Sequence, residues 1–118
     1  LPTALEHPTG FGHLLDAFER AVTPPIEVVV VGPVDDPRTD ALWREVVGRL
    51  LPSSVVVRAA GGPAAPATPL LEGRDARGRV PTAYVCEHYA CRAPVTEPSA
   101  LAAELDAALA ARGAAARR

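Results

Sequence analysis

Apolar runs and amphipathic segments alternate along this chain. The run 26–31 is an almost unbroken series of β-branched residues, a shorter Val-rich run occupies 54–58, and the run Thr-Ala-Tyr-Val-Cys occupies 82–86. A strand that is apolar on both sides is typical of a parallel sheet buried between helices. The segment 37–51 repeats apolar residues at helical spacing, so the order strand, helix, strand predicts a right-handed parallel unit.

Two further amphipathic segments predict helices near the ends of the chain. The first covers Thr9–Val22, with Thr9 as its N-cap, and its apolar face must pack on something. The last begins after Thr96 as N-cap, buries a leucine stripe and ends at Gly113. For the middle helix, Asp36 is the predicted N-cap and Pro37 the first helical residue.

These elements predict one small three-layer α/β domain over residues 1–118. Its sheet is expected to be mainly parallel, with three strands in the order 2-1-3 and helices on both faces. The Gly-, Ala- and Pro-rich segment 59–80 is predicted to be a long irregular connection with at most one helical turn. In such a sheet the loops Gly32–Asp36 and Cys86–Cys91 would be neighbours at the carboxyl edge.

The composition of the chain argues against two classes of function, nucleic-acid binding and membrane association. All 12 basic residues are arginine, and the net charge of −2 provides no electrostatic footprint for nucleic acid or an anionic membrane. No apolar run approaches the roughly 20 residues that span a bilayer, and no signal segment opens the chain, which predicts a cytoplasmic protein without a membrane partner. The use of arginine without lysine, together with the abundance of Ala, Pro and Gly, suggests the coding bias of a GC-rich bacterial genome. The start at Leu1 rather than Met suggests a piece of a longer polypeptide.

The two cysteines enclose four residues in Cys86-Glu-His-Tyr-Ala-Cys91. A redox active site of the thioredoxin type would have two intervening residues at a helix N-terminus. Three interpretations remain open: two structural thiols, which is favoured, a regulatory disulfide, or a metal set completed by His88. A structural zinc site needs four ligands, so no metal is predicted.

The loop Gly32–Asp36 follows a strand and precedes a helix, where α/β proteins bind phosphate. Its single glycine and its two acids, Asp35 and Asp36, favour a helix-capping turn, so no cofactor is predicted. We list Gly32, Asp35, Asp36 and His88 as candidate contacts of the edge loops.

The segment 72–79 interleaves Arg74, Arg77 and Arg79 with acidic residues, which is typical of a solvated turn. The chain has no Ser-His-Asp arrangement and no pair of acids on a common face. No catalytic residue is assigned, and whether the chain is an enzyme stays undecided.

The stretch Thr82-Ala-Tyr-Val-Cys-Glu followed by Cys91-Arg-Ala-Pro-Val-Thr-Glu-Pro98 resembles the C-terminal signature of the YyaL-like, thioredoxin-domain-containing proteins. That family includes the spermatogenesis-associated relatives of animals. The usual sequence motif of that family has an amide residue at the position of His88 and an aspartate at the position of Glu97. The resemblance extends from about Thr9, but its specific part is 82–98.

The resemblance implies that the chemistry lies elsewhere. Family members carry an N-terminal thioredoxin-like domain and then an α/α-barrel resembling N-acylglucosamine epimerases, with a region like this chain last. The segment 9–22 would then be a linker helix or the tail of the barrel. The expected function is a non-catalytic accessory domain that packs on its own upstream domains, with a homo-oligomer left open. The alternative is a thiol-redox or metal-responsive module that uses Cys86 and Cys91.

Overall fold

The computed structural model describes residues 1–62, 67–88 and 90–118. Part of the predicted connection 59–80 therefore lies outside the described residues. The helices and strands follow one another as α1 (Pro2–Glu6), a 3-10 turn (Pro8–Gly10), α2 (Gly12–Val22), β1 (Ile26–Val31), α3 (Pro37–Val47), β2 (Ser54–Ala59), a second 3-10 turn (Arg77–Arg79), β3 (Thr82–Glu87), β4 (Ala90–Cys91) and α4 (Pro98–Ala116).

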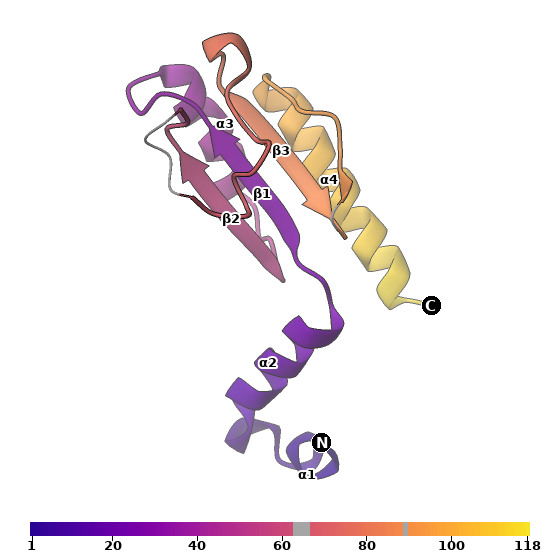
Figure 1. The fold of residues 1–118 in the computed structure, drawn as a ribbon. Helices are drawn as coiled ribbons and strands as arrows, with labels where there is room; N and C mark the ends of the chain where they lie inside the picture. The colour runs from indigo at the N-terminus through magenta and orange to yellow at the C-terminus, as the bar shows by residue number, and fades with distance from the viewer. Residues whose placement is uncertain (63–66, 89) are drawn as a thin grey trace.

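The sheet has four strands in the order β2-β1-β3-β4 (Figure 1). The predicted order of the first three strands is confirmed, and β1 and β2 are parallel, with Val31 beside Ala59. The prediction of a mainly parallel sheet is wrong for β3, which runs antiparallel to β1 and places Thr82 beside Val31. The cause is the connection: it leaves β2 and enters β3 at the same edge of the sheet, whereas a parallel β3 would require a crossover to the opposite edge.

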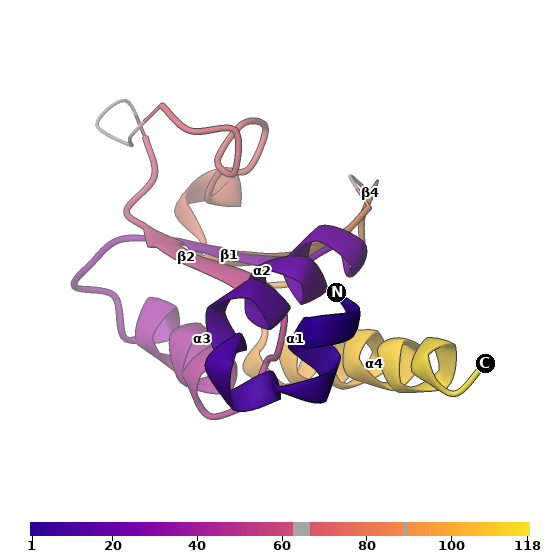
Figure 2. The same cartoon turned by 90° about the horizontal axis from the view of Figure 1, so that it is seen from below.

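Both large helices of the body, α3 and α4, cover one face of the sheet (Figure 2). The core on this face consists of alternate residues of β1 and β3 packed on the apolar stripes of the two helices, namely Ile26, Val28, Val30, Leu42, Val46, Ala83, Val85, Leu101, Leu105 and Ala108. The expectation of helices on both faces is therefore wrong.

The second face of the sheet is covered by the connection between β2 and β3. Leu71 and Ala76 of this connection pack against a smaller buried cluster that includes Val29 and Tyr84. The Tyr84 hydroxyl donates a hydrogen bond to the Asp75 carbonyl at 2.8 Å and accepts one from the Asp75 amide at 3.2 Å. β1 is thus buried on both sides, as its sequence predicts, but with a loop in place of a helix on one side.

The predicted helix boundaries differ in accuracy. Asp36 is the N-cap of α3, and its side chain accepts a hydrogen bond from the Arg38 amide at 2.9 Å, which confirms the prediction. Thr9 is not a cap, because it lies in a 3-10 turn and α2 begins only at Gly12. α3 ends at Val47, so Leu50, placed on its apolar face by periodicity, is 88% exposed.

The last helix is longer than predicted. α4 runs through Gly113 to Ala116, and its N-cap is Glu97 rather than Thr96, with no side-chain capping bond. Leu101 and Leu105 are buried as expected. A glycine weakens a helix interior by about 1 kcal/mol, which the alanine-rich flanks of Gly113 offset through their high helix propensity.

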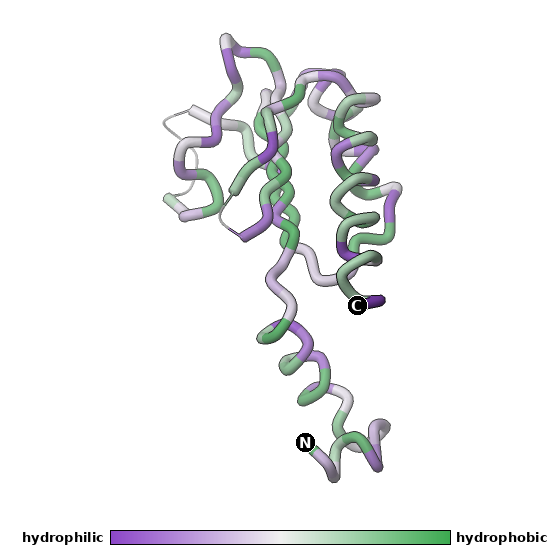
Figure 3. Tube along the Cα trace, turned by 90° about the vertical axis from the view of Figure 1, so that its right-hand side faces the viewer, coloured by the Kyte–Doolittle hydropathy of each residue, from purple (hydrophilic) through white to green (hydrophobic). Residues whose placement is uncertain are grey.

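Residues 1–23 form an arm that projects from the start of β1, away from the sheet (Figures 1 and 3). The molecule measures 53 × 29 × 23 Å, and the arm accounts for its long axis. The 3-10 turn connects α1 to α2 within the arm. Across the described ranges of the chain, none of the helices combines the length and the apolar character that crossing a bilayer demands.

Candidate functional site

Cys86 and Cys91 form a disulfide across the β3–β4 hairpin. The two residues are direct register partners, with Cα atoms 3.9 Å apart and sulfurs 1.99 Å apart. Their surroundings differ: Cys86 is 1% exposed beneath the covering connection, whereas Cys91 is exposed on the edge strand. The favoured interpretation of two structural thiols is therefore wrong, because the two cysteines are bridged.

Arg74 lies against this bridge. Its Nη2 atom is 3.6 Å from the Cys91 sulfur and 2.8 Å from a carboxylate oxygen of Glu27. The Arg74 side chain is only 12% exposed, so the prediction of a solvated turn is wrong for this arginine. Glu27 reaches it because Glu27 is the register partner of Cys86 on β1, on the face that the connection covers.

The hairpin is held by more than the disulfide. The Arg92 amide donates a hydrogen bond to the Val85 carbonyl at 2.9 Å. Farther along, Val95 and Ala83 exchange backbone hydrogen bonds of 2.8 and 3.0 Å. The Arg92 side chain also reaches Glu104 on α4 at 3.2 Å. The segment after Cys91 therefore stays attached to β3 at several points that do not involve sulfur.

The loop Gly32–Asp36 lies at the opposite edge of the sheet from the cysteines. Because β3 is antiparallel, Cys86 is beside the start of β1 and not beside its end, so the expected proximity of the two loops is wrong. Asp35 is exposed. Hydrogen bonds from Arg38 lower the pKa of Asp36, so this carboxylate is fully engaged as a helix cap.

Gly32 has a packing role at this edge. A Cβ atom there would lie 2.4 Å from the Thr39 hydroxyl oxygen and 2.9 Å from the Pro81 side chain. The glycine lets β1 end against the first turn of α3 and the residue before β3. This close approach explains Gly32 without a ligand.

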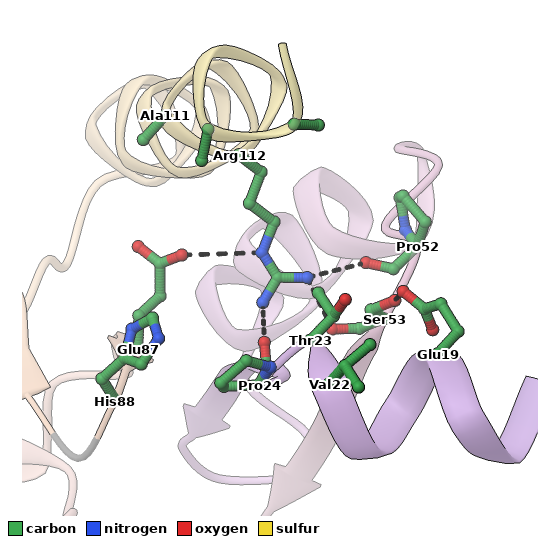
Figure 4. A pocket seen from close by; sticks show the side chains of 12 residues that line it. Glu19, Val22, Thr23, Pro24, Pro52, Ser53, Glu87, His88, Ala111 and Arg112 are labelled. Atoms are coloured by element: carbon green, nitrogen blue, oxygen red, sulfur yellow. Dashed lines mark hydrogen bonds and ion pairs between the residues drawn. The ribbon is translucent and has the colours of Figure 1, made fainter. Parts of the chain in front are cut away.

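His88 lies in the turn after β3 with a φ of +50° and is exposed. It lines a cleft of about 630 Å³ between the arm and the end of α4 (Figure 4). In the described ranges, no group of three or more His, Cys, Asp or Glu side chains gathers around a metal position, and the disulfide occupies both cysteines.

Arg112 of α4 points into this cleft (Figure 4). Its guanidinium donates hydrogen bonds to the carbonyl oxygens of Pro24 and Ser53, the latter at 3.0 Å, and lies 3.7 Å from Glu87. Ser53 in turn donates a hydrogen bond to Glu19 of α2. The guanidinium is thus occupied by groups of the body, and the hydrogen bond between Ser53 and Glu19 makes this cleft the joint between the body and the arm.

Comparison of the chain with known protein families, with curated proteins and with solved structures finds no match. The resemblance to the YyaL-like family therefore continues to depend on residues 82–98 alone.

The sequence did not single out Arg112, and it placed Arg74 in a solvated turn. Each is one arginine among many in an Arg-rich chain, and its partners are distant in sequence. One signal was present for Arg74: Leu70 and Leu71, just before it, are a pair of large apolar residues in a connection rich in Gly, Ala and Pro. Such a pair indicates that the segment returns to the core.

Proposed function

We propose that this chain is the C-terminal accessory domain of a YyaL-like, thioredoxin-domain-containing protein. In this proposal the arm, residues 1–23, docks on the helices of an upstream α/α-barrel in the same polypeptide. The body, residues 24–118, forms the folded end of that polypeptide and carries no catalytic constellation. The resemblance over 82–98 supports the family, and the arm supports the docking.

The observation that carries the proposal is the exposed apolar face of α2. Large apolar residues recur along it and its N-cap at spacings of three and four, and their exposed fractions are 37% for the N-cap Phe11, 49% for Leu14, 44% for Phe18 and 59% for Val22. Two phenylalanines on one exposed stripe favour an interaction surface over a solvated helix. The opposite side of α2 is polar, with Asp16 and Arg20 paired at 3.1 Å.

The body does not need this face. β1 and β3 supply the strand residues of the two buried clusters, α3 and α4 supply the helix residues, and neither cluster includes a residue of α2. No residue of α2 itself is buried. The stripe therefore has no function in the folding of the body, and a partner outside residues 1–118 gives it one.

An all-helical partner fits the stripe best. Residues at spacings of three and four form the ridges by which helices pack on helices. A barrel in the same polypeptide also meets the arm at high effective concentration, so a modest apolar stripe suffices for docking. The joint between Ser53 and Glu19 would then set the angle between the barrel and the body.

Photo-crosslinking in the natural polypeptide that contains this chain tests the proposal. A photoreactive residue in place of Phe18 is expected to crosslink to helical segments upstream of residue 1. The same residue in place of His13, on the polar side of α2, is the control and is expected to give little product. Crosslinks from position 18 to a second copy, or to residues 24–118, would contradict the proposal, as would equal yields at the two positions.

A further inference from the structure

We propose that the Cys86–Cys91 disulfide is a thiol–disulfide exchange site, with Cys91 as the reacting sulfur and Arg74 as the group that stabilises its thiolate. This goes beyond the docking function and does not depend on it. The co-reactant is a dithiol, either a small molecule or a cysteine pair on another protein.

Burial selects the sulfur that is attacked. An incoming thiolate can reach Cys91 on the exposed edge strand, whereas Cys86 is 1% exposed under the connection. Exchange proceeds by attack of a thiolate on a disulfide sulfur. The new bond forms between the dithiol and Cys91, the Cys86–Cys91 bond breaks, and Cys86 leaves as a thiolate that takes a proton from solvent, since burial disfavours its charge.

The second step uses Arg74. The remaining thiolate of the dithiol attacks its own first sulfur, closing the dithiol to a disulfide and releasing Cys91 as a thiolate. The Arg74 guanidinium, with Nη2 3.6 Å from that sulfur, stabilises the developing charge. In total the protein gains two electrons and, with Cys91 left as a thiolate, one proton, whereas the dithiol loses two electrons and releases two protons to solvent. In reverse, the Cys91 thiolate is the nucleophile that attacks an external disulfide.

Glu27 sets how far Arg74 favours the thiolate. Its carboxylate lies 2.8 Å from the same Nη2 atom and neutralises part of the guanidinium charge. Glu87, in contrast, faces Arg92 and Arg112 at 3.8 and 3.7 Å, so its charge is directed away from Arg74. Removing the Glu27 charge should therefore strengthen the effect of Arg74 on Cys91.

The fold allows the bridge to open without unfolding. The Arg92 amide and the Val95–Ala83 pair hold the segment after Cys91 to β3 whether or not the sulfurs are joined. The connection that carries Arg74 is anchored separately by the hydrogen bonds between Asp75 and Tyr84. Both oxidation states thus keep Arg74 beside Cys91.

The first experiment uses the unmodified 118-residue chain. The folded chain is reduced with dithiothreitol and then alkylated with iodoacetamide, and mass spectrometry follows each cysteine separately. We expect Cys91 to react at least about 10-fold faster than Cys86, because a buried thiol is inert. Equal rates, or a bridge that is reduced only when the chain unfolds, would overturn the proposal.

The second experiment measures the pH dependence of Cys91 alkylation. Arg74→Ala is expected to raise the pH of half-maximal rate by about one unit, since a neighbouring cation favours the thiolate. Arg74→Lys should restore part of the shift, and Glu27→Gln should move the midpoint to lower pH. Arg44→Ala, at an exposed position of α3, is the matched control and should leave it unchanged. An unchanged midpoint in Arg74→Ala would show that Arg74 is merely structural.

Discussion

α2 and α4 both carry apolar residues at helical spacing, but only α4 has a partner within the chain. Leu101 and Leu105 of α4 are fully buried against the sheet, whereas Phe11 and Phe18 at the same kind of position in the arm stay exposed. The spacing of apolar residues thus indicates that a helix face packs on a partner, but it does not indicate where that partner is. The difference separates a body that is held together by its own contacts from an arm that is available to something else.

The largest expected effect is a truncation in the body core. Leu105→Ala should lower the free energy of unfolding by about 2–5 kcal/mol, because it leaves a cavity under α4. Phe18→Ala, the matched truncation in the arm, should change it by less than about 0.5 kcal/mol. Urea denaturation of the two variants makes the measurement. A loss at Phe18 as large as that at Leu105 would show that the arm belongs to the core.

A pair of glycines sharpens the same contrast. Gly32→Ala places a Cβ atom 2.4 Å from the Thr39 hydroxyl oxygen, and overpacking of this kind costs about 1–3 kcal/mol. Gly10→Ala, in the arm, meets no atom within 4 Å and should change the free energy of unfolding by less than about 0.5 kcal/mol. The midpoints of urea unfolding compare them. Equal midpoints would contradict the close packing at the end of β1.

A substitution at the joint between the arm and the body should have a smaller effect on the free energy of unfolding and a clear effect on the shape of the molecule. Arg112→Ala removes the hydrogen bonds to the carbonyl oxygens of Pro24 and Ser53 and should cost about 1 kcal/mol. Small-angle X-ray scattering should show a broader distribution of interatomic distances, because Arg112 no longer holds the Ser53 backbone, and Ser53 is the residue that bonds to Glu19 of the arm. Arg117→Ala, at the exposed end of α4, is the control. An unchanged distribution would mean that Arg112 does not hold the arm.

The smallest expected effect concerns the cap of α3. The pKa of Asp36 is lowered in the folded chain by its hydrogen bonds to Arg38, so the unfolded chain binds a proton there first as the pH falls. The contribution of Asp36 is complete above the usual carboxyl value of about 4 and is lost as the pH falls through the lowered pKa. Asp36→Asn keeps a capping oxygen, so its stability should vary less between about pH 4 and pH 2. Identical pH profiles of unfolding would refute this role.

Most of the body could be predicted from its sequence. The run Ile26–Val31 predicts a strand buried on both sides, and the Asp36-Pro37 pair predicts the start of α3; both predictions are confirmed. The direction of β3 could not be predicted, since it depends on where the connection 59–80 crosses the sheet. No local pattern records that path. The expectation that the cysteine loop lies beside Gly32 failed with it.

The candidate sites were less accessible to sequence reasoning. The Cys86–Cys91 spacing permits a bridge, but only the antiparallel pairing of β3 and β4 makes the two residues direct neighbours. Arg74 comes to this bridge from a covering loop, at a separation that no motif encodes. Sequence pattern located the reactive residues, whereas their burial and their charged neighbours depend on long-range topology.

Hydrogen exchange at the amides of α2 measures whether the arm has a partner upstream of residue 1. The exchange rates are compared between the 118-residue chain and a longer polypeptide in which the proposed barrel precedes it, with the amides of β1 as the internal reference. We expect α2 to exchange much faster than β1 in the 118-residue chain, and its protection to rise at least about 10-fold in the polypeptide, where docking adds stability to the helix. Equal protection of α2 in both would contradict the account, because the exposed face of the arm would then have no partner upstream.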